Sequence, residues 1–177
     1  IPFTVGGGIR SVCDIRDLLN AGADKISLGS IAISDPKIVT EASDEFGSQC
    51  IVISLDCKRD GNSWKLFTKG GREKTDLDAV EFASLMEKVD AGELLVNSLD
   101  RDGMKNGYDL ELLTKISEVV NIPVIASSGA GCREDFLKAF DGGRADGALA
   151  ASLFHYGEIN IRELKRYLSD QKVTIRL

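Results

Sequence analysis

Two apolar segments of this chain end in carboxylates. Asp56 directly follows the nearly unbroken apolar run Ile51–Leu55, and Asp100 and Asp102 follow Leu94–Leu99. A carboxylate at the end of a buried strand is partly removed from water and suits general acid or base catalysis. Helix capping or hydrogen bonding within a loop is the other reading of each residue taken alone. Asp56 is the strongest candidate, because its charge comes at once after the apolar run.

A glycine-rich pattern occurs twice. Gly6-Gly7-Gly8 ends one apolar run, and the next apolar run ends at Ser30. Further on, the segment Ala126–Gly131 is followed by a run that ends at Ser152. Glycines after a strand let backbone N–H groups approach a ligand, and the start of the following helix favours an anion. The pattern predicts two phosphate-binding loops, and hence one elongated substrate with a phosphate at each end.

Three further side chains near the predicted strand ends have two readings each. Lys58 and Arg59 follow Asp56 and are either phosphate ligands or solvated surface residues. His155 is the only histidine and comes just after the last predicted strand. It is either a general acid/base or, as we favour, a structural imidazole.

Four polar residues lie at the opposite ends of the predicted strands. Lys25 and Glu93 stand where two strands begin, and Asp24 and Gln49 lie on the same side. Taken alone, they indicate only charges that close the bottom of a barrel or pair at its surface, which contributes to stability.

Six strand-like runs alternate with six helical runs and must position these side chains. Strands are expected at Ile1–Val5, Lys25–Leu28, Cys50–Leu55, Leu94–Leu99, Pro123–Ala126 and Gly147–Ala151. Helices are expected at Val12–Asn20, Pro36–Phe46, Asp78–Val89, Leu110–Val120, Glu134–Phe140 and Ile161–Leu168. Strict alternation predicts an α/β protein with parallel strands. An insertion at residues 60–72 predicts a small hairpin or flap after the third strand.

Glycine and acidic residues at nearly every strand end favour a (β/α)8 barrel over an open, doubly wound sheet. Such barrels take about 250 residues, and six units leave the barrel two units short. The chain also begins at Ile1, inside an apolar run and without methionine. We therefore expect residues 1–177 to be a single barrel domain that lacks its first two strand–helix units.

Composition narrows the class of partner. The 177 residues carry a net charge of −6, which argues against a general nucleic-acid surface. No apolar run approaches the roughly 20 residues that span a bilayer, so no membrane association is expected. The four cysteines form no CxxC pair and have no histidine at metal-ligand spacing. We expect reduced thiols in the cytoplasm and neither a metal nor a cofactor, with a disulfide or a metal site as the lesser alternative.

Several motifs together resemble one family. They occur in order along the whole chain: Val5–Arg10, Gly22–Lys25, Phe46–Gln49, Asp100–Gly103 with Gly107–Asp109, Ala126–Gly131, Ala148–Phe154 and Arg162–Lys165. The combination closely resembles the cyclase subunits of imidazole glycerol phosphate synthase, although Val5–Ile9 alone is shared with related isomerases. The resemblance implies a (β/α)8 barrel of the ribulose-phosphate-binding type, made of two duplicated halves. This chain then corresponds to strands 3 to 8 with their helices.

The resemblance also implies an activity. These lyases act in histidine biosynthesis, where ammonia from a partner glutaminase reacts with phosphoribulosyl-formimino-aminoimidazole carboxamide ribonucleotide. The products are imidazole glycerol phosphate and aminoimidazole carboxamide ribonucleotide, and the substrate carries two phosphates. By matching position, Asp56 and Asp102 are implied as catalytic, Lys25 and Glu93 as half of an ammonia gate, and Asp24 and Gln49 as glutaminase-facing. The implied phosphate-binding residues are Gly7, Gly8, Gly29, Ser30, Gly103, Ser128, Gly129, Ala151 and Ser152.

Three positions depart from the family pattern. Gly29 stands where many members have asparagine, Ser128 where many have glycine, and Asn97 where threonine is common. We expect these changes to adjust the phosphate contacts rather than abolish them. Because the other catalytic aspartate of the family belongs to the first strand, we also expect the 177 residues alone to lack turnover.

Other readings stay open at this point. One is the paralogue that installs amidino groups in surface polysaccharides with the same ammonia chemistry. Another is a binding fragment without activity. The related sugar isomerase uses no ammonia, and the matching Lys25 and Glu93 argue against it.

Overall fold

The computed structural model describes residues 1–176. Six parallel strands form the body of one sheet in the order β1-β2-β3-β6-β7-β8, so that β1 and β8 are its two ends. The six predicted strands are all present. Their bounds are β1 (Thr4–Gly6), β2 (Lys25–Leu28), β3 (Ile51–Asp60), β6 (Glu93–Ser98), β7 (Val124–Ser127) and β8 (Gly147–Ala148).

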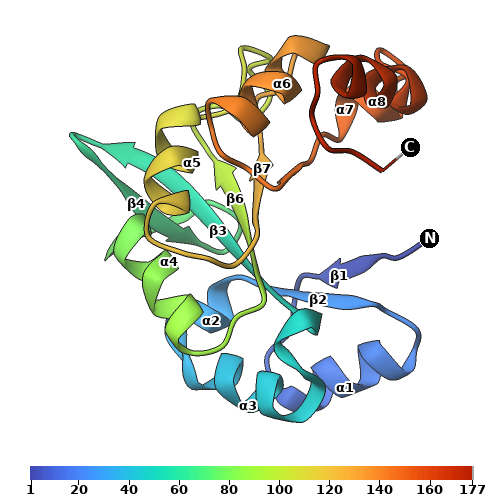
Figure 1. The fold of residues 1–177 in the computed structure, drawn as a ribbon. Coiled ribbons are helices and arrows are strands. Elements are labelled where there is room, and N and C mark those ends of the chain that lie inside the picture. The colour runs from blue at the N-terminus through green and yellow to red at the C-terminus, as the bar shows by residue number, and fades with distance from the viewer. Residues whose placement is uncertain (177) are drawn as a thin grey trace.

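The helices lie around the outside of the curved sheet, and both chain ends lie on its open side (Figure 1). This arrangement confirms the α/β class and corresponds to part of a (β/α)8 barrel. The six predicted helices are present, and the short elements α2, α7 and η1 were not predicted. The bounds are α1 (Val12–Asn20), α2 (Ser30–Ser34), α3 (Lys37–Phe46), η1 (Ser48–Cys50), α4 (Ala79–Lys88), α5 (Leu110–Ser117), α6 (Arg133–Asp141), α7 (Ser152–His155) and α8 (Ile161–Asp170).

The predicted hairpin is larger than expected. β3 continues past its parallel partners to Asp60 and pairs antiparallel with β4 (Ser63–Thr68), which in turn pairs with β5 (Glu73–Asp78). Trp64 and Leu66 of β4 are fully buried. The hairpin is therefore a packed extension of the sheet, not a loose flap.

The two faces of the sheet differ in burial. On β2 and β6, buried residues such as Ile26, Leu94 and Val96 alternate with half-buried ones. The buried set packs in the core with the outer helices. The half-buried set includes Ser27 of β2 and Asn97 of β6, and Asn97 donates a hydrogen bond to the half-buried Ser54 of β3 on the same face. One face of the sheet thus holds the core and the other presents polar side chains. Within residues 1–176, none of the helices has the length and apolar character needed to cross a membrane.

Candidate functional site

Two separate cavities lie at the carboxyl ends of the parallel strands. The first has a volume of about 980 Å³ and is bordered by the ends of β1 and β2, by β3 and by the β4–β5 turn. Asp56 lines it. So do four of the predicted phosphate-binding residues: Gly7, Gly8, Gly29 and Ser30.

The second cavity has a volume of about 310 Å³ and is bordered by the loops after β6, β7 and β8. Asp102 lines it together with the other five predicted phosphate-binding residues: Gly103, Ser128, Gly129, Ala151 and Ser152. The structure thus gathers the predicted residues into two groups. Each group holds one phosphate loop pair and one of the two aspartates.

The loop from β1 to α1 is fixed by a capping box. The Asp14 carboxylate accepts hydrogen bonds from the backbone N–H groups of Arg10 (2.9 Å) and Ser11 (3.0 Å), and the Ser11 hydroxyl accepts one from Asp14. These bonds, first that from Arg10, lower the pKa of Asp14 below its ordinary value. Gly8 has φ of +75° with open space where a Cβ would lie. A side chain there would be strained and would point into free space beside the cavity.

Ser30 ties the hairpin to the first cavity. Its Oγ accepts a hydrogen bond of 2.9 Å from the backbone N–H of Lys69, which lies just after β4. The Ser30 hydroxyl can still donate its own proton to an anion. Lys69 and Gly70 line the same cavity. The hairpin therefore forms one wall of this site.

Asp56 is held by a neighbour on the next strand. β3 and β6 pair Asp56 directly with Asn97, and the Asn97 amide donates hydrogen bonds to Asp56 Oδ1 (3.0 Å) and Ser54 Oγ (3.1 Å). Asn97 lines neither cavity. Its contact is with the candidate acid/base, and the expectation that it adjusts phosphate contacts stays a prediction. Burial raises the pKa of the adjacent Cys57 thiol well above its ordinary value, so it adds no charge beside Asp56.

The second cavity depends on a close backbone contact. The Gly107 N–H donates a hydrogen bond of 2.8 Å to the Gly129 carbonyl, and a Cβ on Gly129 would lie 2.4 Å from the Gly107 carbonyl oxygen. Ser128 adopts φ of +74°, a conformation that favours glycine. The Tyr108 hydroxyl donates to the Leu149 carbonyl at 3.0 Å and joins the loop after β6 to the end of β8.

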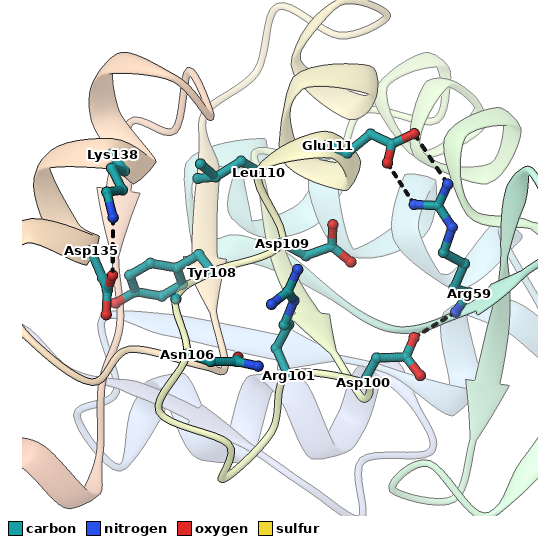
Figure 2. Close-up of a pocket in the computed structure, with 11 residues that line it drawn as sticks. Arg59, Asp100, Arg101, Asn106, Tyr108, Asp109, Leu110, Glu111, Asp135 and Lys138 are labelled. Carbon is teal, nitrogen blue, oxygen red and sulfur yellow. Dashed lines mark hydrogen bonds and ion pairs between the residues drawn. The ribbon is translucent and has the colours of Figure 1, made fainter.

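Asp100 and Arg59 lie outside both phosphate cavities. The Asp100 carboxylate accepts a hydrogen bond of 2.7 Å from the Arg59 N–H, and the Arg59 guanidinium pairs with Glu111 at 2.6 Å. Both residues line a third cleft, of about 570 Å³, between the loop after β6 and the starts of α5 and α6 (Figure 2). Asp100 therefore holds the loop after β6 against β3, which is the loop-bonding reading. Lys58 also lies away from the two cavities, beside Lys74.

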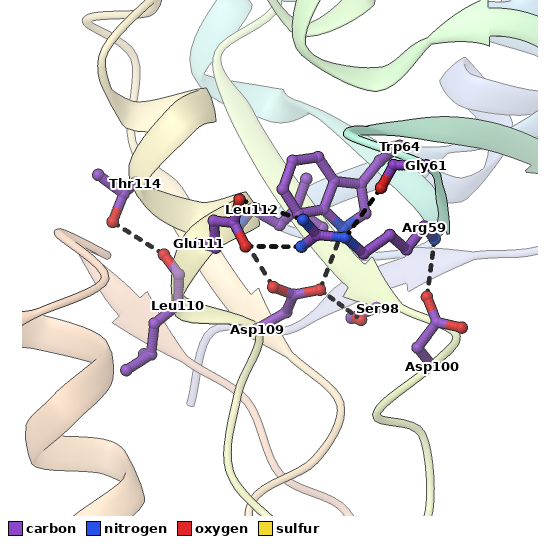
Figure 3. A network of polar contacts seen from close by, with 10 residues as sticks. All are labelled: Arg59, Gly61, Trp64, Ser98, Asp100, Asp109, Leu110, Glu111, Leu112 and Thr114. Atoms are coloured by element: carbon purple, nitrogen blue, oxygen red, sulfur yellow. Dashed lines mark hydrogen bonds and ion pairs between the residues drawn. The ribbon is translucent and has the colours of Figure 1, made fainter.

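A buried network braces the hairpin beside this cleft (Figure 3). Asp109 accepts hydrogen bonds from Trp64 Nε1 (3.1 Å), Ser98 Oγ (3.1 Å) and the Leu112 N–H (3.2 Å). The Arg59 guanidinium lies over the Trp64 ring, 4.6 Å from its centre. One carboxylate thus joins β4, β6 and the start of α5.

His155 ends α7 and is exposed, with its ring 5.0 Å from that of Tyr156. It does not line the second cavity. This position fits the structural reading better than a role in acid/base chemistry.

The predicted gate residues and the predicted glutaminase-facing residues lie at the amino ends of the strands. Lys25 Nζ lies 2.5 Å from Glu93 Oε2, on strands separated by β3. Asp24 accepts a hydrogen bond of 2.8 Å from the Phe3 N–H, and Gln49 donates one of 3.3 Å to the Phe46 carbonyl. Asp24 and Gln49 are exposed. The four residues lie at the opposite end of the sheet from the cavities, as expected.

Sequence reasoning missed several residues at the cavities. Arg10 and Lys69 line the first cavity, and Lys105 lines the second. Arg10 comes two residues after Gly8, the last glycine of the first run, and this short spacing could have indicated it as a cavity residue. Lys69 and Lys105 lie in irregular segments whose position over the cavities depends on tertiary structure.

A parallel α/β sheet with helices around its outside and glycine-rich loops at the carboxyl ends of its strands defines a protein of the (β/α) barrel class. A family model described as histidine biosynthesis protein matches residues 1–160. Two relatives from Dehalococcoides mccartyi, strains BAV1 and CBDB1, are each 51% identical over 177 residues. Both are named imidazole glycerol phosphate synthase subunit HisF, and the match covers 100% of this chain and 70% of each relative. The chain belongs to the histidine biosynthesis protein family.

Proposed function

We propose that this chain serves the cyclase step of histidine biosynthesis, a lyase reaction. Ammonia reacts with phosphoribulosyl-formimino-aminoimidazole carboxamide ribonucleotide to give imidazole glycerol phosphate, aminoimidazole carboxamide ribonucleotide and one molecule of water. The identity of 51% to two HisF subunits supports this reaction over that of the polysaccharide paralogue. The observation that carries the proposal is the pair of cavities, each with one set of phosphate loops and one aspartate.

The two cavities bind the two phosphates of the substrate. In the first, the β1–α1 loop and Ser30 supply backbone and hydroxyl donors. In the second, Gly103, Gly129 and Ser152 supply the equivalent groups. Such donors suit phosphate in a chain of net charge −6, because oriented N–H groups carry partial positive charge without a basic surface. The reacting part of the substrate then lies between the cavities, over the concave face.

Asp56 is the general acid/base on this face. The Asn97 amide, 3.0 Å from one carboxylate oxygen, fixes its orientation and leaves the other oxygen for the substrate. Asp102 lines the second cavity and acts beside the other phosphate. A positioned acid/base of this kind contributes about 10²–10⁴ to a rate.

Residues at the amino ends of the strands take part in the delivery of ammonia. The Lys25–Glu93 pair forms part of the gate, and the exposed Asp24 and Gln49 contact a glutaminase. The cavities open at the carboxyl ends of the strands, so ammonia enters from one side and the phosphorylated substrate from the other. This separation keeps free ammonia out of bulk water.

A chimera tests this function. The 177 residues replace the matching segment of the BAV1 relative, and turnover is measured with ammonium and the purified ribonucleotide. We expect formation of both products, with a rate that rises with ammonia concentration. Isomerisation of the substrate without ring closure, or a rate independent of ammonia, would contradict the proposal. The unmodified relative provides the control.

A further inference from the structure

One lysine lies at each phosphate cavity, and each is held by a glutamate. Lys69 Nζ lies 2.7 Å from Glu73 Oε1 at the first cavity. Lys105 lines the second cavity, and its Nζ contacts both carboxylate oxygens of Glu158, which lies outside that lining, at 2.6 and 2.7 Å. We propose that these two lysines are phosphate-docking residues, and that each glutamate holds its lysine at the cavity until a phosphate takes its place. This inference rests on the proposed function, since it assumes that both cavities bind phosphate.

The backbone of each lysine is fastened to the phosphate loops. The Lys69 N–H donates to the Ser30 hydroxyl at 2.9 Å. The Lys105 carbonyl packs so closely against Gly131 that a Cβ there would lie 2.1 Å from its oxygen. Both lysines have left-handed backbone, with φ of +53° and +52°. Because a lysine in this conformation is strained, its position indicates that neighbouring contacts fix it there.

The side chains, by contrast, are free to exchange partners. In both pairs the lysine and the glutamate are between 41% and 66% exposed. Ion pairs this open to water are weak, because the solvent screens them and ordering two long side chains costs entropy. A phosphate dianion carries more charge than one carboxylate and offers more acceptor oxygens, so it competes well for the ammonium group.

The charged residues that line each cavity indicate what these lysines contribute to phosphate binding. Lys105 is the one cation among the residues that line the second cavity, which also holds Asp102. The first cavity has Arg10 and Lys69 against Asp56 and Glu73. In a chain of net charge −6, a single cation beside the backbone donors offsets the neighbouring carboxylates and adds to the attraction that the donors exert on a dianion.

The test uses the ¹⁵N-labelled 177-residue chain and inorganic phosphate as the probe. Amide signals of Gly8 and Ser30 report the first cavity, and those of Gly103 and Gly129 report the second. We expect Lys69→Met to raise the phosphate Kd at the first cavity about fivefold or more and to leave the second unchanged. Lys105→Met has the opposite selectivity. Lys105→Arg keeps the charge and restores binding.

Variants of the two glutamates distinguish phosphate docking by the lysines from a merely structural role of the ion pairs. Glu73→Gln and Glu158→Gln release the lysines, so each lowers the Kd at its own cavity about twofold or more. If the pairs only fasten loops, the glutamine variants weaken binding as the methionine variants do. The matched controls are Glu118→Gln and Lys88→Met, exposed residues at the amino side of the sheet. They change the net charge equally and leave the ratio of the two Kd values unchanged.

Two results would overturn the inference in distinguishable ways. If phosphate shifts the reporter amides but the lysine variants bind it as tightly as the unmodified chain, the docking role is wrong and the phosphate cavities stand. If phosphate shifts none of the reporter amides in the unmodified chain, the cavities themselves are misassigned. The proposed function then loses its support together with the inference. The same spectra show whether each variant is folded.

Discussion

Asn97 donates a hydrogen bond of 3.0 Å to the Asp56 carboxylate, from a strand whose register places the two residues side by side. The contact lies beside the first cavity, which Asp56 and Ser54 line. It gives the candidate acid/base one fixed oxygen and one free oxygen. One of the three positions that depart from the family pattern thus contacts the carboxylate that we propose as the acid/base.

Asn97→Asp tests this contact by charge. The substitution removes the amide that donates to Asp56 and places a second carboxylate at hydrogen-bond distance, where the like charges repel and Asp56 loses its fixed orientation. We expect turnover of the chimera to fall about tenfold or more, with little change in the substrate KM. Asn97→Thr, which restores the residue common in the family, should keep turnover within about threefold of the unmodified chimera. Equal turnover for Asn97→Asp and the unmodified chimera would contradict the positioning role of Asn97.

Ser128→Gly should stabilise the protein. Ser128 has a φ of +74°, a conformation that costs an L-residue about 1–2 kcal/mol and that glycine adopts without this strain. About half of the resulting gain is offset, because glycine has more conformational freedom to lose from the unfolded chain. We expect a net gain of about 0.5–1 kcal/mol in the free energy of unfolding. Urea denaturation followed by the fluorescence of Trp64, the single tryptophan, measures it.

Gly129→Ala is the matched opposite of that variant. Its Cβ would lie 2.4 Å from the Gly107 carbonyl oxygen, at a φ of +102°. We expect a loss of about 2 kcal/mol or more. If Ser128→Gly destabilises, or if Gly129→Ala is neutral, this description of the β7 loop is incorrect.

Asp14 gives a stability that depends on pH. The hydrogen bond from the Arg10 N–H lowers its pKa in the folded protein below that of the unfolded chain. The ionised carboxylate therefore stabilises the fold above the unfolded pKa, and the contribution is lost as pH falls through the folded pKa. Between about pH 6 and about pH 3, the unmodified chain should lose more stability than Asp14→Asn. Equal losses in urea titrations at the two pH values would contradict this.

Asp109→Ala removes the carboxylate that joins β4, β6 and α5. It deletes three hydrogen bonds, one of them to the fully buried Trp64, and leaves buried donors without partners. We expect a loss of about 2–4 kcal/mol in the free energy of unfolding, measured by circular dichroism. Ser98→Ala removes one bond and keeps the other two, so it should cost about 1 kcal/mol. Equal costs for the two variants would show that Asp109 is not the centre of the network.

Much of the fold could be predicted because its signals are local. Apolar runs and helical periodicity locate all six parallel strands and the six longer helices, and Ser11 marks the start of α1 through its capping box. The short helices α2 and α7 follow Gly29 and Ala151 and are too brief to show a period. The extension of β3 to Asp60 was missed because polar residues end the apolar run at Asp56, while the pairing with β4 continues.

The glycines and acidic residues of the candidate site could be predicted from the sequence, but the side chains that contact them could not. The loops after β1 and β7 carry glycine patterns that can be recognised in the sequence alone. The partner of Asp56 depends on which residue of β6 lies opposite, and the positions of Lys69 and Lys105 depend on how irregular segments fold over the sheet. Tertiary contacts, and not the local sequence, determine these positions. Asp100 shows the same limit, since the sequence left catalysis and loop hydrogen bonding both open, and only the structure shows that its carboxylate accepts a hydrogen bond from the Arg59 backbone.

Turnover of Asp56→Asn in the chimera tests the central claim most directly. The amide keeps the shape of the carboxylate but cannot take up a proton, so we expect turnover to fall about 10²–10⁴-fold. The phosphate loops are untouched, so substrate binding should stay within about threefold of the unmodified chimera. Turnover close to that of the unmodified chimera, with a folded protein and normal binding, would contradict the account.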